Sequence, residues 1–278
     1  MRFSVVDTFA DEAFAGNPAA VVLVPAFPSV ELMQATAHGI ELPTTAFVVP
    51  AAPGEYRVRW FTPYKEINLC GHATIASARY LWANTDADGH DRLRFHSDAG
   101  VLEAERVGGQ VALRLPVAAL TPCVPPSGLE SALGARVVSC AESSDDLLVE
   151  LESAAAVTAV APDFAALARL PFRGHIVTAA GGPRADFVSR TFFPSLGVDE
   201  DQVCVTAHCK LAPYWAEKLQ RGRLTALQLS ERGGRLVIET GAETVRVLGS
   251  AVLRDTHGPR GAARSGEGHG APVAVSTR

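Results

Sequence analysis

The sequence predicts an α+β protein built from two similar lobes, each containing strands and helices. The chain has 278 residues, enough for one large domain or for two lobes of ordinary size, each with its own apolar core. Apolar, β-branched runs at residues 19–24, 45–49 and 56–61 alternate with alanine-rich segments of helical period, which indicates both kinds of element. A short internal repeat then assigns one strand–turn–helix unit to each half.

The first elements in chain order are a strand, a helix and another strand. Residues 1–7 lack the positive region, the long apolar stretch and the cleavage site of a secretory signal, so we expect a cytoplasmic protein that begins with a strand. Ser29 is a typical N-cap and opens a predicted helix that ends near Gly39. Residues 45–49 follow as a strand.

A proline-rich segment at about residues 121–127 interrupts every periodic pattern and is the expected connection between the lobes. Residues 1–120 then form the N-terminal lobe and residues 128–255 the C-terminal lobe, with the last strand free to return to the first lobe. Residues 256–278 are rich in Gly, Ala, Arg and Ser without periodicity, which predicts a disordered tail.

Composition narrows the possible partners. A formal net charge of −5 argues against a nucleic-acid partner, because phosphate binding needs clustered Lys and Arg. No apolar run approaches the ~18 residues that would span a membrane. The five cysteines form no CxxC pair and no zinc-like spacing, so we expect free thiols and no metal site.

The repeat joins two copies of one pattern. Each copy reads Arg-x-Phe-x-Pro, then an acidic turn, then Cys-x-x-Ala at the start of a helix. The first copy runs from residues 59–63 to residues 70–73, and the second runs from residues 190–194 to residues 204–207. The match covers few positions, so a chance similarity is the alternative. A real repeat predicts a pseudo-twofold axis that brings two helix N-termini together.

Two thiols would then face one cavity. A helix N-terminus presents unpaired N–H groups and partial positive charge, which attract carboxylates and lower the pKa of a cysteine placed there. Cys70 and Cys204 occupy these positions, and together they could supply the base and the acid for a proton transfer beside a carboxylate. The alternative is that both are buried structural thiols.

Several motifs resemble the PhzF-like isomerase family. They are the segments at residues 14–21, 61–63, 70–74, 200–201, 228–230 and 232–234, and the resemblance runs from Met1 to about Arg254. It implies the diaminopimelate-epimerase-like fold, with two pseudo-symmetric lobes that each wrap a mainly antiparallel or mixed sheet around a central helix. It also implies proton-transfer chemistry without a cofactor or metal, and a homodimer.

The resemblance is incomplete at the site. Thr44 stands where phenazine-pathway members carry a catalytic glutamate, and threonine cannot serve as that base. His72, Asp201 and Thr206 match the family's histidine, aspartate and serine. Residues 202–206 read Gln-Val-Cys-Val-Thr where the family commonly has Pro-x-Thr-Gly-Ser. Diaminopimelate epimerase and the proline racemases carry a cysteine pair at the positions matched by Cys70 and Cys204.

These comparisons predict a catalytic set and a binding set. The catalytic set is Cys70, Cys204, His72 and Asp201. The substrate-binding set is Asn17, Thr44, Gly71, Ala73, Val205, Thr206 and Ala207.

The expected function is cofactor-independent isomerisation of a small carboxylate-bearing metabolite, by double-bond migration or epimerisation. An unsaturated imino acid of an antibiotic pathway is one such substrate. Two alternatives stay open. The same proton abstraction could lead to dehydration of a hydroxy amino or imino acid, or the missing glutamate could mark a member that binds its ligand without catalysis.

Overall fold

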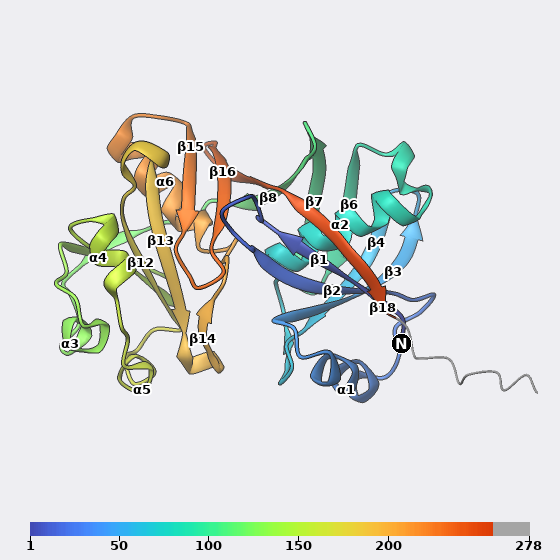
Figure 1. Cartoon of the computed structure of the whole chain (residues 1–278), viewed down its shortest axis with the longest axis horizontal. Coiled ribbons are helices and arrows are strands. Elements are labelled where there is room, and N and C mark those ends of the chain that lie inside the picture. Colours follow the sequence, from blue (N-terminus) through green and yellow to red (C-terminus); the bar gives the residue numbers. More distant parts are fainter. Residues whose placement is uncertain (258–278) are drawn as a thin grey trace, which may run out of the picture.

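Two lobes lie side by side in the computed structural model, which describes residues 1–257 (Figure 1). The strands of both lobes belong to one continuous mixed sheet. No helix among these residues is long and apolar enough to cross a membrane. The expected tail lies outside the described residues except for its first two positions, which belong to the last strand.

The N-terminal lobe contains the first eight strands and both of the longer helices that precede the connection. Its elements are β1 (Phe3–Thr8), β2 (Asn17–Leu23), α1 (Val30–Ile40), β3 (Thr44–Ala52), β4 (Glu55–Phe61), β5 (Glu66–Ile67), α2 (Gly71–Asn84), η1 (Asp86–Gly89), β6 (Arg92–Ser97), β7 (Gly100–Val107) and β8 (Gln110–Pro116).

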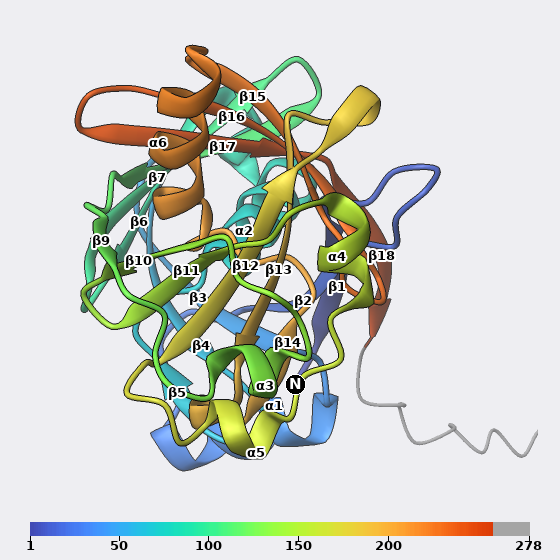
Figure 2. The same cartoon turned by 90° about the vertical axis from the view of Figure 1, so that its left-hand side faces the viewer.

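The C-terminal lobe carries short helices on its outer side, in front of the strands in Figure 2. Its elements are β9 (Thr121–Cys123), α3 (Leu129–Leu133), β10 (Ser139–Ser143), β11 (Asp146–Glu150), α4 (Ala154–Ala159), α5 (Phe164–Leu167), β12 (Gly174–Ala180), η2 (Gly182–Arg184), β13 (Phe187–Phe193), η3 (Pro194–Leu196), β14 (Val198–Asp201), α6 (His208–Leu219), β15 (Arg223–Gln228) and β16 (Gly234–Thr240).

The last two strands tie the lobes together. Strand β17 (Thr244–Gly249) pairs on one side with β16 and on the other with β8 of the N-terminal lobe. Strand β18 (Ala251–His257) then runs antiparallel to β1. The final strand therefore lies in the first lobe.

The two lobes repeat the same order of strand pairings. In the first lobe β2 and β3 are parallel, β3 and β4 antiparallel, and β4 and β6 parallel. In the second lobe β11 and β12 are parallel, β12 and β13 antiparallel, and β13 and β15 parallel. This correspondence confirms the pseudo-symmetry that the sequence repeat predicts.

A central helix fills each lobe. Helix α2 is buried at 10 of its 14 positions, many of them Gly, Ala or Ser, whose small side chains let the surrounding strands approach closely. Helix α6 packs against β15, β16 and β17, and its Trp215 stacks on Phe187 of β13 with ring centroids 5.8 Å apart. Each helix N-terminus points toward the junction of the lobes, where the site is formed.

Two boundaries differ from the sequence predictions. The expected connection at 121–127 includes strand β9, which pairs with β10. Helix α1 is capped by the Ser29 side chain as predicted, but it passes through Gly39 and ends at Ile40, and its C-cap Glu41 adopts the left-handed conformation with φ 59°. The Glu41 N–H bonds the Ala37 carbonyl, which closes the helix without a glycine.

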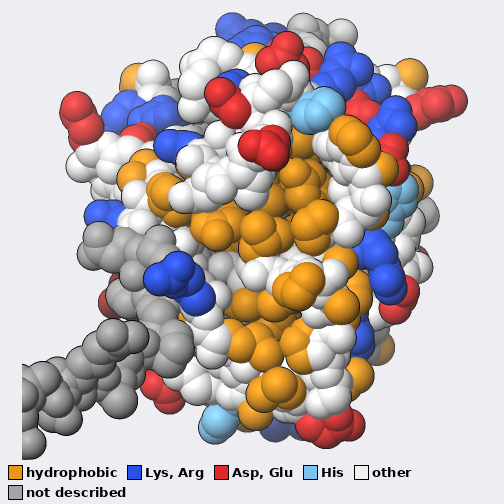
Figure 3. All heavy atoms as spheres, turned by 90° about the vertical axis from the view of Figure 1, so that its right-hand side faces the viewer, with side chains coloured by type: hydrophobic (Ala, Val, Ile, Leu, Met, Phe, Trp, Pro, Cys, Tyr) orange, Lys and Arg blue, Asp and Glu red, His pale blue; other side chains and the backbone are white. Residues whose placement is uncertain are grey.

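Apolar side chains gather in a broad band on the outer face of the N-terminal lobe (Figure 3). Exposed apolar patches of this kind mark interaction surfaces in many proteins. The homodimer implied by the family resemblance stays a prediction.

Candidate active site

A cavity of about 680 Å³ opens where the lobes meet. The N-terminal lobe contributes the end of α1, the start of β3 and the segment that leads from β4 into α2. The C-terminal lobe contributes Arg173, the end of β13, most of the β14 region and the start of the α6 segment. Most of the lining is apolar, so the few polar groups that reach it are the candidates for chemistry.

The two helix starts touch at the back of this cavity. A methyl carbon added to Gly71 would lie 2.5 Å from Val205 Cβ, so only glycine permits this approach. The cavity is lined at this point by Gly71, His72, Val205 and Thr206. Among the hydrogen bonds of the described residues, none has the backbone N–H of any of these four residues as its donor. These groups form a ready site for a carboxylate or an oxyanion.

A mutation that introduces a steric overlap between Gly71 and Val205 should lower the stability of the protein. Gly71→Ala is expected to destabilise the protein by about 1–3 kcal/mol, because the new methyl group overlaps Val205. Adding Val205→Gly removes the overlap and should recover part of the loss. Urea denaturation of both single variants and the double variant measures the coupling. Gly39→Ala is the matched control, since a methyl group there meets nothing within 4 Å; a similar loss in that control would contradict the contact.

The two cysteines have equivalent surroundings. Cys70 Sγ accepts a hydrogen bond from the Ala73 N–H and lies 3.4 Å from His72 Nδ1. Cys204 Sγ accepts from the Ala207 N–H and lies 3.4 Å from Thr206 Oγ1. In each lobe the thiol therefore interacts with the residues two and three positions later.

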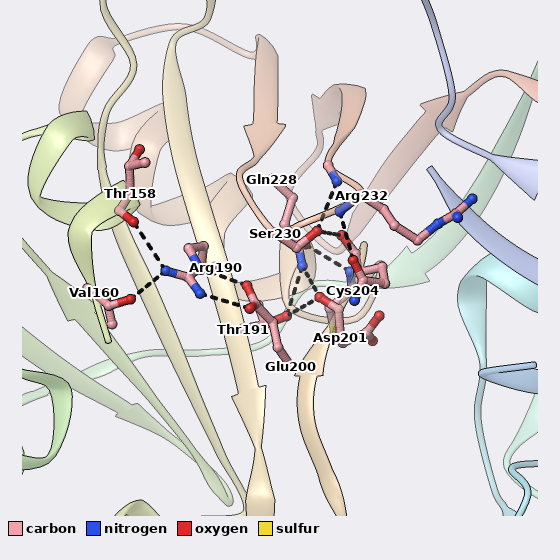
Figure 4. Close-up of polar contacts among 12 residues, drawn as sticks. Thr158, Val160, Arg190, Thr191, Glu200, Asp201, Cys204, Gln228, Ser230 and Arg232 are labelled. Carbon is pink, nitrogen blue, oxygen red and sulfur yellow. Dashed lines mark hydrogen bonds and ion pairs between the residues drawn. The ribbon is translucent and has the colours of Figure 1, made fainter. Parts of the chain in front are cut away.

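The arginines of the repeat are also equivalent. Arg59 of β4 binds both carboxylate oxygens of Glu66 on β5 at 2.6 Å. Arg190 of β13 binds both oxygens of Glu200 on β14 at 2.8 Å, and its third nitrogen donates to the Val160 carbonyl (Figure 4). Each ion pair fixes the position of a short strand, β5 or β14, which precedes the cysteine of its lobe.

The pKa values of the thiols contradict the expectation of partly ionised cysteines. Burial raises the pKa of Cys70 to about 12, although its hydrogen bonds to Thr44 and the Ala73 N–H act in the opposite direction. Burial, together with the nearby Asp201 carboxylate, also raises the pKa of Cys204. Loss of hydration outweighs the field of the helix N-terminus at both positions, so both thiols are protonated at neutral pH.

Asp201 is a carboxylate of the cavity whose pKa is raised toward neutral pH. Its Oδ1 atom accepts hydrogen bonds from Asn17 Nδ2 at 2.8 Å and from the Val203 N–H at 3.2 Å. Burial raises the pKa of Asp201 to about 6, while these bonds and one from the Cys204 thiol hold it down. A carboxylate with this pKa is ionised at pH 7 yet remains a competent base.

Of the remaining predicted residues, some line the cavity and others hold the residues that line it. Thr44 lines the cavity and accepts a hydrogen bond from the Cys70 thiol at 3.5 Å. His72 also lines it, and burial lowers the pKa of this imidazole to about 4, so the ring is neutral. Asn17 is fully buried, and its amide binds Asp201 and the Val203 carbonyl, whereas the sequence analysis expects it to bind substrate.

Cys204, Ala73 and Ala207 are not among the residues that line the cavity in the described part of the chain. The Cys204 thiol instead hydrogen-bonds Asp201. Of this thiol and the Asp201 carboxylate, only the residue that carries the carboxylate lines the cavity together with Cys70.

Two residues with a role in the site, Gln228 and Arg173, were not predicted from the sequence. Gln228 accepts from the Cys204 N–H at 2.9 Å and donates to Thr191 Oγ1 at 3.0 Å, which fixes the turn that holds Asp201 (Figure 4). Arg173 lines the cavity from the C-terminal lobe and is held by buried Asp146. The repeat gives no signal for Arg173, since its second copy covers residues 190–207 and Arg173 lies before it.

Comparisons with known proteins agree with this architecture. An uncharacterized isomerase of Pseudomonas aeruginosa is 47% identical over 91% of this chain and 96% of its own length. The phenazine biosynthesis-like domain-containing protein 1 of Mus musculus is 33% identical over 90% of this chain and 95% of its own length.

Solved structures show the same fold. A phenazine biosynthesis protein of the PhzF family from Enterococcus faecalis superposes with a TM-score of 0.86 at 38% identity, over 92% of this chain and 98% of that one. A hydroxyproline epimerase from Agrobacterium vitis shares the fold at 12% identity, with a TM-score of 0.58 over 92% of this chain and 91% of that one. The family described as phenazine biosynthesis-like protein matches residues 6–256. The chain therefore belongs to the PhzC-PhzF family.

Proposed function

We propose that this protein is a cofactor-independent isomerase that moves a proton on a small carboxylate-bearing metabolite. One observation carries the proposal. Asp201, whose pKa is about 6, and the protonated Cys70 thiol line one cavity beside the free N–H groups of two helix starts. Titratable groups with pKa values driven apart are the arrangement expected of a base and an acid.

In this mechanism Asp201 removes a proton from a carbon next to the substrate carboxylate, or conjugated with it. The electron pair of the broken C–H bond moves into the conjugated system, and the four N–H groups stabilise the resulting oxyanion. Cys70 then donates its proton to a second carbon. Because the pKa of Cys70 lies above that of Asp201, transfer of the proton from Asp201 back to the thiolate is downhill and resets the site.

His72 supports this reset. Its Nδ1 atom is 3.4 Å from Cys70 Sγ, and the neutral ring can relay a proton by accepting it at one nitrogen while it donates another from the second, so that the ring stays neutral overall. Thr44 accepts the thiol hydrogen bond and orients it. The pair formed by Cys70 and Asp201 thereby replaces the glutamate that phenazine-pathway relatives carry at position 44.

A two-thiol mechanism, with Cys204 as the base, remains the second candidate because the surroundings of the two thiols are equivalent. It would need the Cys204 proton to leave a fully buried sulfur beside a carboxylate, which opposes ionisation. We therefore assign Cys204 the role of holding Asp201 by a hydrogen bond.

Solvent-hydrogen exchange tests the function. The protein is incubated in D₂O with a panel of small unsaturated carboxylates that includes unsaturated imino acids, and products are followed by NMR and mass spectrometry. An isomerase incorporates deuterium at carbon and shifts or inverts the substrate. A dehydratase instead forms a product that has lost water, and a binding protein gives no exchange with a bound ligand.

The pH profile distinguishes the two bases. With Asp201 as base, kcat/KM for exchange should fall tenfold per pH unit below about pH 6 and be flat from about pH 7 to pH 9. A thiolate base would instead give a rate that climbs through the alkaline range, because both thiols titrate far above neutrality. The exchange rate is measured by NMR on samples quenched at fixed times, at pH values from about 4.5 to about 9.

A further inference from the structure

Arg173 is the cation of the cavity whose position is fixed most firmly. It directly precedes β12, and its side chain, 38% exposed, lines the cavity. Its Nε and Nη2 atoms donate to the two carboxylate oxygens of Asp146 at 2.9 and 2.6 Å. The Ser195 hydroxyl binds the Arg173 carbonyl at 2.9 Å, and the guanidinium lies over the ring of Phe193 at 5.8 Å.

The charge of Arg173 is not cancelled by this anchor. The Asp146 side chain is 1% exposed and is shared with buried Lys210, whose Nζ is 2.7 Å from Asp146 Oδ2. One carboxylate therefore meets two cations. Asp145 also approaches Arg173, with its Oδ2 atom 3.1 Å from Nε, and because its side chain is 52% exposed this ion pair is weaker than the one with Asp146. No hydrogen bond of the described residues uses Arg173 Nη1.

The other charges of the cavity do not compete for the same role. Glu66 and Glu200 line it, but each is fully engaged by its own arginine. Glu41 and Lys65 are exposed at its opening. Asp201 is the reactive carboxylate, which leaves Arg173 as the cation of the cavity lining that is held in place by a buried partner.

The pseudo-symmetry shows that this cation belongs to one lobe only. In the first lobe Thr45 pairs with Phe61, and in the second His175 pairs with Phe192. Because Phe61 and Phe192 are the equivalent phenylalanines of the repeat, Arg173 corresponds to Pro43. The two helix starts at the centre of the cavity are therefore related by the pseudo-symmetry, whereas the positive charge of Arg173 comes from the C-terminal lobe alone.

We propose that Arg173 binds a second anionic group of the substrate, so that the substrate class is small carboxylates with a second acidic group across an apolar spacer. The apolar side chains of Phe193, Leu196 and Val198 line the cavity beside Arg173 and suit such a spacer. This inference rests on the proposed function for its first carboxylate, which the helix N–H groups bind. The arginine then decides which way round the substrate enters.

Binding of matched probes tests the inference without turnover. Glutarate and glutaric acid monoamide have the same length and differ in one charge. Isothermal titration calorimetry should show that the wild-type protein binds glutarate at least about tenfold more tightly than the monoamide. Arg173→Gln should remove this preference, and Arg136→Gln, which changes an exposed arginine of the same lobe, should retain it.

An unchanged preference in Arg173→Gln, or no preference in the wild-type protein, would overturn the proposal. If Arg173→Gln does not fold, Arg173→Lys decides. It keeps the charge beside Asp146 but loses the planar fork, and it should reduce the preference at least about threefold.

The same titration in Asp201→Asn separates this inference from the function. That variant should keep the preference for glutarate although its hydrogen exchange is slowed by about 10²–10⁴-fold. A wild-type protein that shows the Arg173-dependent preference but never exchanges would refute the isomerase proposal and leave the anion subsite standing.

Discussion

Asp201→Asn is expected to lower the rate of solvent-hydrogen exchange by about 10²–10⁴-fold, the contribution typical of a positioned general base. Asparagine is nearly the same size and cannot accept a proton at neutral pH. The amide oxygen of the new side chain can still accept the hydrogen bonds that Asn17 Nδ2 and the Val203 N–H donate to Asp201 Oδ1. The loss should therefore be in kcat, with ligand binding retained.

The same substitution should stabilise the protein above pH 6. The folded-state pKa of Asp201, about 6, lies above the ordinary value of 3.8, so its favourable contribution to stability exists below pH 3.8 and is lost as pH rises through 6. At pH 8 the buried charge costs up to about 3 kcal/mol, which asparagine removes. Urea denaturation should show almost no gain at pH 3.5, about half of the full gain at pH 5 and the full gain at pH 8, because the cost of the buried charge develops between the two pKa values.

Asp199→Asn is the matched control, since Asp199 is exposed on the same strand. It should change neither exchange nor the pH dependence of stability. An Asp201→Asn variant that exchanges at the wild-type rate would exclude Asp201 as the base and favour the two-thiol mechanism.

Cys70→Ser is the second substitution with a large expected effect. A serine hydroxyl is a much weaker acid than a thiol, so exchange should fall by orders of magnitude, again about 10²–10⁴-fold. Cys204→Ser is the matched comparison in the other lobe. It should cost less than about tenfold, because a serine hydroxyl can still donate to Asp201 from behind the cavity.

NMR exchange assays at pH 7.5, with each variant checked for folding, separate the mechanisms. If the two serine variants lose activity equally, and the double variant loses no more than either, Cys204 acts with Cys70 as one catalytic pair. A full loss in Cys70→Ser alone supports the pair of Cys70 and Asp201.

The repeat made the arrangement of the site predictable from the sequence. Arg-x-Phe-x-Pro and Cys-x-x-Ala correspond to a strand and a helix start in each lobe, and the contact of Gly71 with Val205 is the meeting of helix ends that they predict. Spacing along the chain is enough for such a prediction because equivalent sequences fold into equivalent units.

The ionisation of the site was not predictable in the same way. Helix position alone suggests a low pKa for Cys70, but the surrounding protein removes the water that an ionised thiol needs. Burial depends on how two lobes close over each other, which no local pattern records. Asn17 illustrates the same limit, because its partner Asp201 lies 184 residues away in the sequence.

The pairing of β17 with both β16 and β8 also constrains how this molecule can move and evolve. The chain crosses between the lobes near residue 120 and returns through a shared strand, so the lobes are hydrogen-bonded halves of one sheet and do not hinge on a loose tether. An N-terminal fragment that ended at the connection would lack β17 and β18. One edge of β8 and one edge of β1 would then have no strand to pair with. The two lobes therefore form one structural unit, although they retain the pattern of a duplication. The sheet that they share keeps the two helix N-termini in position relative to each other.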